Sequence, residues 1–156
     1  MNVQQKNKDK GFTIIEVVLV LAIAGLIFLM VFIALPALQR GQRDTQRKND
    51  MSRAMTAVNN YQSNNRGVAP SNWTDFATKY LEVNGDTFAD PSGTKYIFVP
   101  GTTKPVISDT FDGAAPNIYA TKGATCNGED IDLGKGNNKI ALQMKLEGGG
   151  ISCQSN

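Results

Sequence analysis

The chain has 156 residues, a formal net charge of +2 and a hydrophobic fraction of 41%. This length suits one domain or a small domain with an appended segment, and the charge is too small to indicate nucleic-acid binding. The sequence contains no histidine, which excludes Ser-His-Asp, Cys-His and histidine–metal chemistry. No phosphate-binding loop, carboxylate dyad or nucleophile–base pair stands out, so the sequence does not predict an enzyme or a cofactor.

An apolar segment occupies residues 12–38. A helix needs about 20 apolar residues to cross a bilayer core, so this segment is long enough to span a membrane. It is too long for the apolar core of a secretory signal peptide, which has about 7–15 residues. Lysines precede the segment and Arg40 follows it closely, so the distribution of positive charge does not by itself set its orientation.

Glu16 is the only charged residue in the apolar segment. Near the end of a membrane helix, its carboxylate can reach the lipid headgroups and then needs no function. Deeper in the membrane a charge costs about 2.5–3.5 kcal/mol, which calls for a positive partner. Cleavage between Gly11 and Phe12 would supply one. The new amine on Phe12 of a neighbouring copy would lie beside Glu16 if the copies were shifted axially by about 6 Å.

The stretch KGFTIIE at residues 10–16, followed by the apolar run, resembles the processing signal of type IV prepilins and pseudopilins. The resemblance implies that a membrane prepilin peptidase cuts after Gly11 on the cytoplasmic side. It also implies N-methylation of Phe12 and pairing of Glu16 with the N-terminus of an adjacent subunit during filament assembly.

Two residues of the apolar helix bear on its shape. Gly25 falls where many members of the family have a helix glycine. Pro36 comes eleven residues after Gly25, farther along than the family's usual helix proline. Because proline removes a backbone hydrogen bond, we expect Pro36 to kink or loosen the helix, at a position that the family pattern does not fix.

Residues 39–65 read as an amphipathic helix. Apolar residues recur at helical spacing from Met51 to Tyr61, so one face can pack on a body. Opposite charges three or four residues apart can form helix-surface pairs worth about 0.2–0.5 kcal/mol each. We interpret these charges as a solvated face, or as a basic cluster that contacts lipid headgroups or acidic neighbours. The four possible pairs are Arg40–Asp44, Asp44–Lys48, Arg47–Asp50 and Asp50–Arg53.

The rest of the chain predicts a short helix and several strands. Gly67 can take the left-handed conformation that ends the first helix, and a second helix fits residues 72–82. Candidate strands are residues 96–99, 104–108 and 117–121, a half-buried strand from Ile140 to Glu147, and a return strand with Ile151 and Cys153. The predicted fold class is α+β, with the long N-terminal helix packed on a small antiparallel sheet of about four strands.

Cys126 and Cys153 are the only cysteines. If the body is exported, we expect them to form one disulfide, with free thiols and a metal pair as alternatives; the resembling family often has a C-terminal disulfide of this kind. Glu129, Asp130 and Asp132 place oxygen ligands close together and are a weak candidate for binding Ca²⁺, with an acidic solvated turn as the default.

The resemblance implies four segments: a cytoplasmic leader at 1–11, a transmembrane and filament-core half-helix at 12–38, an amphipathic half-helix at 39–65, and an extracellular head at 66–156. It implies a pilus subunit that polymerises with copies of itself and with minor pilins. Before assembly the subunit lies in the membrane lipid, and an assembly ATPase and an inner-membrane platform protein transfer it into the filament. Such a filament would serve adhesion, twitching motility or DNA uptake.

Two alternatives remain open at this stage. The chain can be a pseudopilin of a competence or type II secretion system. It can instead be a single-pass, membrane-anchored binding domain that never polymerises, in which case the Gly11–Phe12 bond stays intact. No direct nucleic-acid motif is visible in the sequence.

Overall fold

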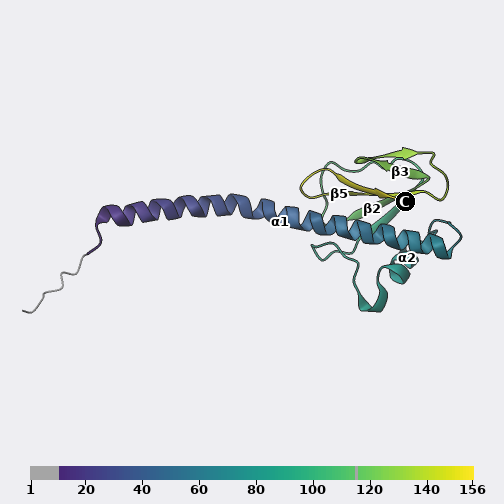
Figure 1. Cartoon of the computed structure of the whole chain (residues 1–156), viewed down its shortest axis with the longest axis horizontal. Helices are drawn as coiled ribbons and strands as arrows, with labels where there is room; N and C mark the ends of the chain where they lie inside the picture. The colour runs from purple at the N-terminus through teal and green to yellow at the C-terminus, as the bar shows by residue number, and fades with distance from the viewer. Residues whose placement is uncertain (1–10, 115) are drawn as a thin grey trace, which may run out of the picture. The chain divides into compact units, whose positions relative to one another are not determined.

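The computed structural model describes residues 11–114 and 116–156, so the leader residues 1–10 lie outside the described residues. The chain divides into two units after Leu38, and we call the second unit, residues 39–156, the body (Figure 1). The elements in chain order are the helices α1 (Ile14–Asn64) and α2 (Trp73–Tyr80), the 3₁₀ turn η1 (Val83–Gly85), and the strands β1 (Ile97–Gly101), β2 (Asn117–Lys122), β3 (Ala124–Asn127), β4 (Asp130–Leu133), β5 (Ile140–Lys145) and β6 (Ile151–Ser155).

Helix α1 ends in two left-handed residues. Arg66 has a φ of 55° and Gly67 a φ of 79°. The backbone N–H of Gly67 donates to the carbonyl oxygen of Gln62 at 2.8 Å, which is the long hydrogen bond of a Schellman motif. The left-handed conformation predicted for Gly67 is confirmed, although the preceding arginine adopts it as well. Pro36 lies inside α1, and the predicted kink there stays a prediction.

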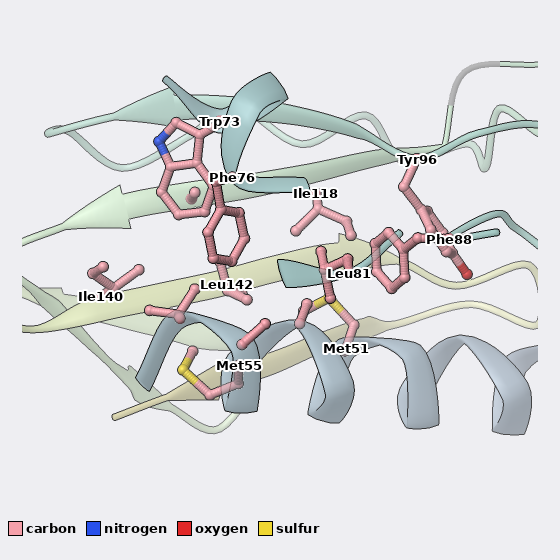
Figure 2. Close-up of a cluster of buried hydrophobic side chains, with 14 of the residues drawn as sticks. Met51, Met55, Trp73, Phe76, Leu81, Phe88, Tyr96, Ile118, Ile140 and Leu142 are labelled. Atoms are coloured by element: carbon pink, nitrogen blue, oxygen red, sulfur yellow. The ribbon is translucent and has the colours of Figure 1, made fainter. Parts of the chain in front are cut away.

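The core of the body lies between α1, α2 and the main sheet. The face of α1 that carries Met51, Met55 and Val58 is buried, as its helical spacing predicts. Figure 2 shows Met51 and Met55 directed from α1 into the cluster of buried side chains. Trp73 and Phe76 of α2 contribute aromatic rings to the same cluster, 5.4 Å apart between centroids. The remaining core residues include Leu81, Phe88, Tyr96, Ile118, Ile140, Leu142 and Met144.

Helix α2 begins where the sequence predicts it. The side-chain oxygen of Asn72 accepts hydrogen bonds from the backbone N–H groups of Thr74 and Asp75 at 3.0 and 3.2 Å. These bonds satisfy two of the free donors at the helix start. The cap fixes the first turn of α2, and with it the position of Trp73 over the core.

The main sheet has four strands in the order β1-β2-β5-β6. The pairs β2–β5 and β5–β6 are antiparallel. The α+β prediction, a long helix packed on a small sheet of about four strands, is confirmed. One edge differs, because β1 pairs with β2 in parallel. A parallel neighbour requires a crossover connection, which here is the long segment between β1 and β2.

A second, two-stranded antiparallel sheet pairs β3 with β4. The sequence prediction missed this hairpin, and its presence overturns the prediction that residues 140–147 form a half-buried strand. Ala141 and Gln143 are buried together with the apolar residues of β5, because the hairpin contacts β5 and β6 from the second face of the sheet. The strand predicted at residues 104–108 is also wrong, since this segment has no regular structure. Its Pro105 lacks the N–H that a sheet ladder uses.

Candidate processing and assembly site

The expected cleavage point lies at the exposed start of α1. Gly11 and Phe12 precede the helix, and the side chain of Phe12 is 88% exposed. Among the described residues other than its chain neighbours, none has an atom within 4 Å of the position that a Cβ on Gly11 would occupy. Within the described residues, nothing packs against this end of the helix.

Thr13 and Glu16 form a capping box at the start of α1. The Glu16 carboxylate oxygen Oε2 accepts from the backbone N–H of Thr13 at 2.9 Å and from its hydroxyl at 2.7 Å. In return, the hydroxyl oxygen of Thr13 lies 3.4 Å from the backbone nitrogen of Glu16. This is the reciprocal arrangement that a Thr-x-x-Glu sequence predicts at a helix start. This capping role of Glu16 was not predicted, although Thr13 and Glu16 have the spacing of a capping box.

The apolar part of α1 is exposed along its whole length. Every large apolar side chain from Phe12 to Leu38 is exposed within the described chain, by 48% or more. By its length and composition the helix can cross a membrane. An apolar surface of this extent requires lipid or other apolar helices around it.

The comparisons with known proteins identify the segment. Residues 6–32 match the family model described as the prokaryotic N-terminal methylation motif. The chain carries the class III signal peptide of type IV pilins and pseudopilins. No curated protein and no solved structure matches the chain significantly.

The pilin-type signal covers the predicted site residues Gly11, Phe12 and Glu16 as well as Gly25. The structure brings Glu16 together with Thr13 of its own chain. The signal and the apolar helix are consistent with a precursor anchored in the membrane.

The body contains a buried charged cluster centred on Arg47 of α1. The side chain of Arg47 is 1% exposed, and its Nε and Nη2 atoms donate to the two carboxylate oxygens of Asp90 at 2.6 and 3.0 Å. Its Nη1 donates to Asp44 at 2.9 Å and to Glu147 at 3.1 Å. The guanidinium carbon lies 4.2 Å from the centroid of the Phe111 ring, a cation–π contact. Arg47 thereby joins α1 to three other parts of the body.

Asp44 and Arg43 hold the turn that follows β5. The carboxylate of Asp44 accepts from the backbone N–H of Glu147 at 2.9 Å and from that of Gly148 at 2.7 Å. Arg43 donates two hydrogen bonds to the carboxylate of Glu147, at 2.8 and 2.5 Å. A Cβ on residue 148 would lie 2.9 Å from Oδ2 of Asp44, so this close approach requires glycine.

Two carboxylates of the cluster, those of Glu147 and Asp90, have lowered pKa values. The hydrogen bond from Arg43, opposed by partial burial and aided by Arg47, lowers the pKa of Glu147 to about 2. Burial acts to raise the pKa of Asp90, but the hydrogen bonds from Arg47 and from Ser92 outweigh it, so the net shift is downward. Removing any one of these hydrogen-bond partners would leave a buried charge without compensation.

The predicted helix-surface pairs are wrong. None of the four predicted pairs is an ion pair within residues 11–114 and 116–156; Asp44 and Arg47 are buried, and Arg53 pairs with Asp86 instead. Spacing along one helix shows only which residues share a face. It does not reveal that the loop before β1 and the turn after β5 supply better partners.

Cys126 of β3 and Cys153 of β6 form a disulfide. Around it lies a small second cluster of buried residues, Ala124, Ile131 and Ala141. Because so few side chains are buried there, the disulfide is a main attachment of the β3–β4 hairpin to the main sheet.

The acidic residues proposed for Ca²⁺ lie at the turn of the β3–β4 hairpin and at its second strand. Asp130 pairs with Lys104 at 2.5 Å, and Asp132 lies 3.7 Å from Lys135. Within the described part of the chain, no group of three or more His, Cys, Asp or Glu side chains gathers in a way that could hold a metal ion. Two of the three candidate carboxylates thus face lysines, which compete with a cation.

Proposed function

We propose that the chain is a structural subunit of a type IV pilus. The observation that supports this most strongly is the pilin-type signal at residues 6–32, together with the apolar half of α1, whose large side chains are all exposed up to Leu38. In this proposal a prepilin peptidase cuts after Gly11 and the new N-terminus on Phe12 is methylated. The apolar half of α1 then leaves the lipid and packs against the same segment of neighbouring copies.

Glu16 has two roles in this proposal. Its Oε2 atom caps its own helix through Thr13. No hydrogen bond within the described residues uses its other oxygen, Oε1, so that atom is available to the N-terminal amine of a neighbouring subunit. Pairing would replace the cost of an unpartnered intramembrane charge by a charge-assisted hydrogen bond.

Assembly in this proposal needs partners besides the chain itself. Extraction of an apolar helix from lipid requires work, which an assembly ATPase acting through an inner-membrane platform protein would supply, with minor pilins as further subunits. The bodies would then face outward as the surface of a filament that serves adhesion or twitching motility. A disulfide between β3 and β6 suits an extracellular position.

Substitutions at the capping box separate its two roles. Glu16→Gln keeps an acceptor for the N–H of Thr13, because glutamine also completes a capping box. It removes the charge, so we expect normal cleavage and a loss of surface filaments of at least about tenfold, the effect of about 1.4 kcal/mol. Thr13→Val is the matched control: it removes the hydroxyl bond but leaves the carboxylate, so filaments should persist.

Cleavage is read from the mass of the membrane-bound chain and filament yield from the sheared surface fraction. Normal filaments from Glu16→Gln would show that the carboxylate serves only as a cap and would refute the pairing. A processed parent chain that never enters the sheared fraction would favour the pseudopilin role instead.

A further inference from the structure

A cavity of about 280 Å³ lies over the second face of the main sheet, and we call it the hairpin cavity. Its lining comes from three parts of the body: the segment 102–114 that follows β1, the β3–β4 hairpin, and the strands β5 and β6. All of these parts belong to the body, so the inference below does not rest on filament assembly. The lining residues that matter for the inference are Lys104, Ile107, Glu129, Asp130, Gln143 and Ile151.

The hairpin cavity is lined by a buried amide that lacks a hydrogen-bond donor. Gln143 is 3% exposed, and its Nε2 atom donates to the backbone carbonyl oxygen of Glu129 at 2.7 Å. Since only the amide nitrogen can donate to a carbonyl, this bond fixes the orientation of the side chain. Among the buried side-chain polar atoms of the described residues, Oε1 of Gln143 alone has no hydrogen-bond partner. A buried acceptor in this state is unfavourable, so a ligand that donates to it is favoured.

Glu129 adds a carboxylate that no cation neutralises. Its side chain is exposed and belongs to no ion pair within the described residues. Its Oε1 atom lies 2.7 Å from the position that a Cβ on Gly150 would occupy, which places the carboxylate against the turn that leads into Ile151. The neighbouring Asp130 is paired with Lys104. The charged residues of the lining therefore leave one net negative charge, that of Glu129.

Lys104 indicates which chemistry the hairpin cavity accommodates. Its ammonium donates to Oδ2 of Asp130 at 2.5 Å, and the same residue lines the cavity. Ile107 and Ile151 are half-buried and add apolar surface to the lining. A methylene chain can pack on such a surface while the cation at its end stays at a carboxylate, as lysine side chains do elsewhere in proteins.

We propose that the hairpin cavity binds a primary ammonium group on a short aliphatic chain, as in linear alkyl amines and diamines. The ammonium donates to the carboxylate of Glu129 and to Oε1 of Gln143, and the methylene chain packs on the two isoleucines. An ammonium has three donors and no acceptor, so one group can serve both oxygens. The volume suits a ligand of a few carbon atoms, since sites for drug-sized ligands measure about 300–1,000 Å³.

An organic cation fits this lining better than a metal ion. Divalent metals such as Ca²⁺ take six to eight oxygen ligands, including several carboxylates. Within residues 11–114 and 116–156, no group of three or more His, Cys, Asp or Glu side chains could hold a metal ion. Here Glu129 is one free carboxylate beside one amide oxygen, which matches the smaller demand of an ammonium group.

The test titrates the full chain with butylamine, in a nonionic detergent at constant ionic strength, and follows amide signals by NMR. The side-chain amide of Gln143 and the backbone amide of Ile151 report on the cavity. Glu129→Gln removes the free carboxylate from an exposed side chain, and Gln143→Leu removes the amide. The matched control, Asp109→Asn, removes an exposed carboxylate of the segment 102–114 that does not line the cavity. Thermal unfolding followed by Trp73 fluorescence verifies folding of each chain.

We expect the parent chain to bind butylamine with a Kd of about 1 mM, as suits so small a ligand. Glu129→Gln should bind about 10–100-fold more weakly, because it loses a charge-assisted hydrogen bond, and Gln143→Leu should also bind more weakly. Asp109→Asn should bind like the parent, and butyrate, which carries the opposite charge, should leave the signals unchanged.

Absence of binding by the parent chain would overturn the proposal, and so would equal binding by Glu129→Gln. An equal loss in Asp109→Asn would show that the amine responds only to the overall charge of the chain and would also overturn it. If Ca²⁺ moved the same signals at lower concentration than butylamine, the cavity would be a metal site instead. The measurement involves no filament, so its failure and the failure of the proposed function are distinguishable.

Discussion

Replacing Arg47 with methionine should destabilise the body severely, because it leaves buried carboxylates without their cation. The side chains of Arg47 and Asp90 are 1% and 0% exposed, so the pair is shielded from solvent. Removing one partner of such a pair typically costs about 3–5 kcal/mol, mostly from the uncompensated charge that remains. For a body of this size, we expect the melting temperature to fall by about 10–20 °C.

Arg53→Met on the same helix is the matched control. Arg53 pairs with Asp86, but their side chains are 40% and 54% exposed. Exposed pairs contribute about 0.2–1 kcal/mol, and the further hydrogen bond to the carbonyl of Leu81 adds about 1 kcal/mol. Arg53→Met should therefore cost less than half as much as Arg47→Met.

The assay follows the fluorescence of Trp73 during thermal unfolding in a nonionic detergent. Trp73 is the only tryptophan and lies buried in the body core, so its signal reports on the body rather than on the apolar segment. A double variant, Arg47→Met/Asp90→Asn, removes both charges and should be more stable than the sum of the single losses. Equal losses for Arg47→Met and Arg53→Met would refute the assignment of Arg47 as the centre of the cluster.

Three further outcomes follow from the body. The folded-state pKa of Glu147, about 2, lies below the unfolded value of 4.5. The contribution of Glu147 to the free energy of unfolding is therefore present above pH 4.5 and is lost as the pH falls toward 2. This contribution is at most about 3–4 kcal/mol before screening by solvent, since the Arg43 side chain is 35% exposed. The dependence of the melting temperature on acid pH should flatten in Glu147→Gln. Gly148→Ala forces a Cβ to 2.9 Å from Asp44 and should lower thermal stability by about 1–3 kcal/mol, whereas Gly101→Ala meets only an ordinary 3.8 Å contact and should change it less. Replacing both cysteines by serine should cost about 3–4 kcal/mol in the same melts, from the 27-residue separation of the disulfide.

Local patterns predicted the parts of the fold that depend on periodicity. The spacing from Met51 to Tyr61 predicted the buried face of α1, and the helical pattern over residues 72–82 predicted α2. The strand pattern from Ile140 to Glu147 predicted β5, although not its burial on both faces, and the return strand with Ile151 and Cys153 predicted β6. Each of these features depends on residues within a few positions of one another.

Features that depend on distant residues were not predictable in this way. The parallel pairing of β1 and β2 depends on a crossover whose path no local pattern encodes. Likewise, the burial of Gln143 depends on the β3–β4 hairpin, whose residues read as an acidic turn in the sequence. Arg47 looked like a surface residue because its main partner, Asp90, is 43 residues away.

At the candidate site, the sequence predicted which residues form the processing signal. It did not lead to the hydrogen bonds that these residues make with one another. The pattern around Gly11 and Glu16 predicted the methylation motif, which the family model confirms. The capping bonds between Thr13 and Glu16 were not predicted, although the spacing of these two residues is that of a capping box.

The central claim, a processed subunit that assembles into a surface filament, is tested most directly by the mass and N-terminal sequence of the chain in its own cells. Membrane and sheared-surface fractions are analysed separately. We predict that the sheared fraction holds chains that begin at Phe12, heavier by one methyl group and lighter by the two hydrogens of the disulfide. A chain found only in membranes, with the Gly11–Phe12 bond intact, would contradict the account and indicate a static anchor.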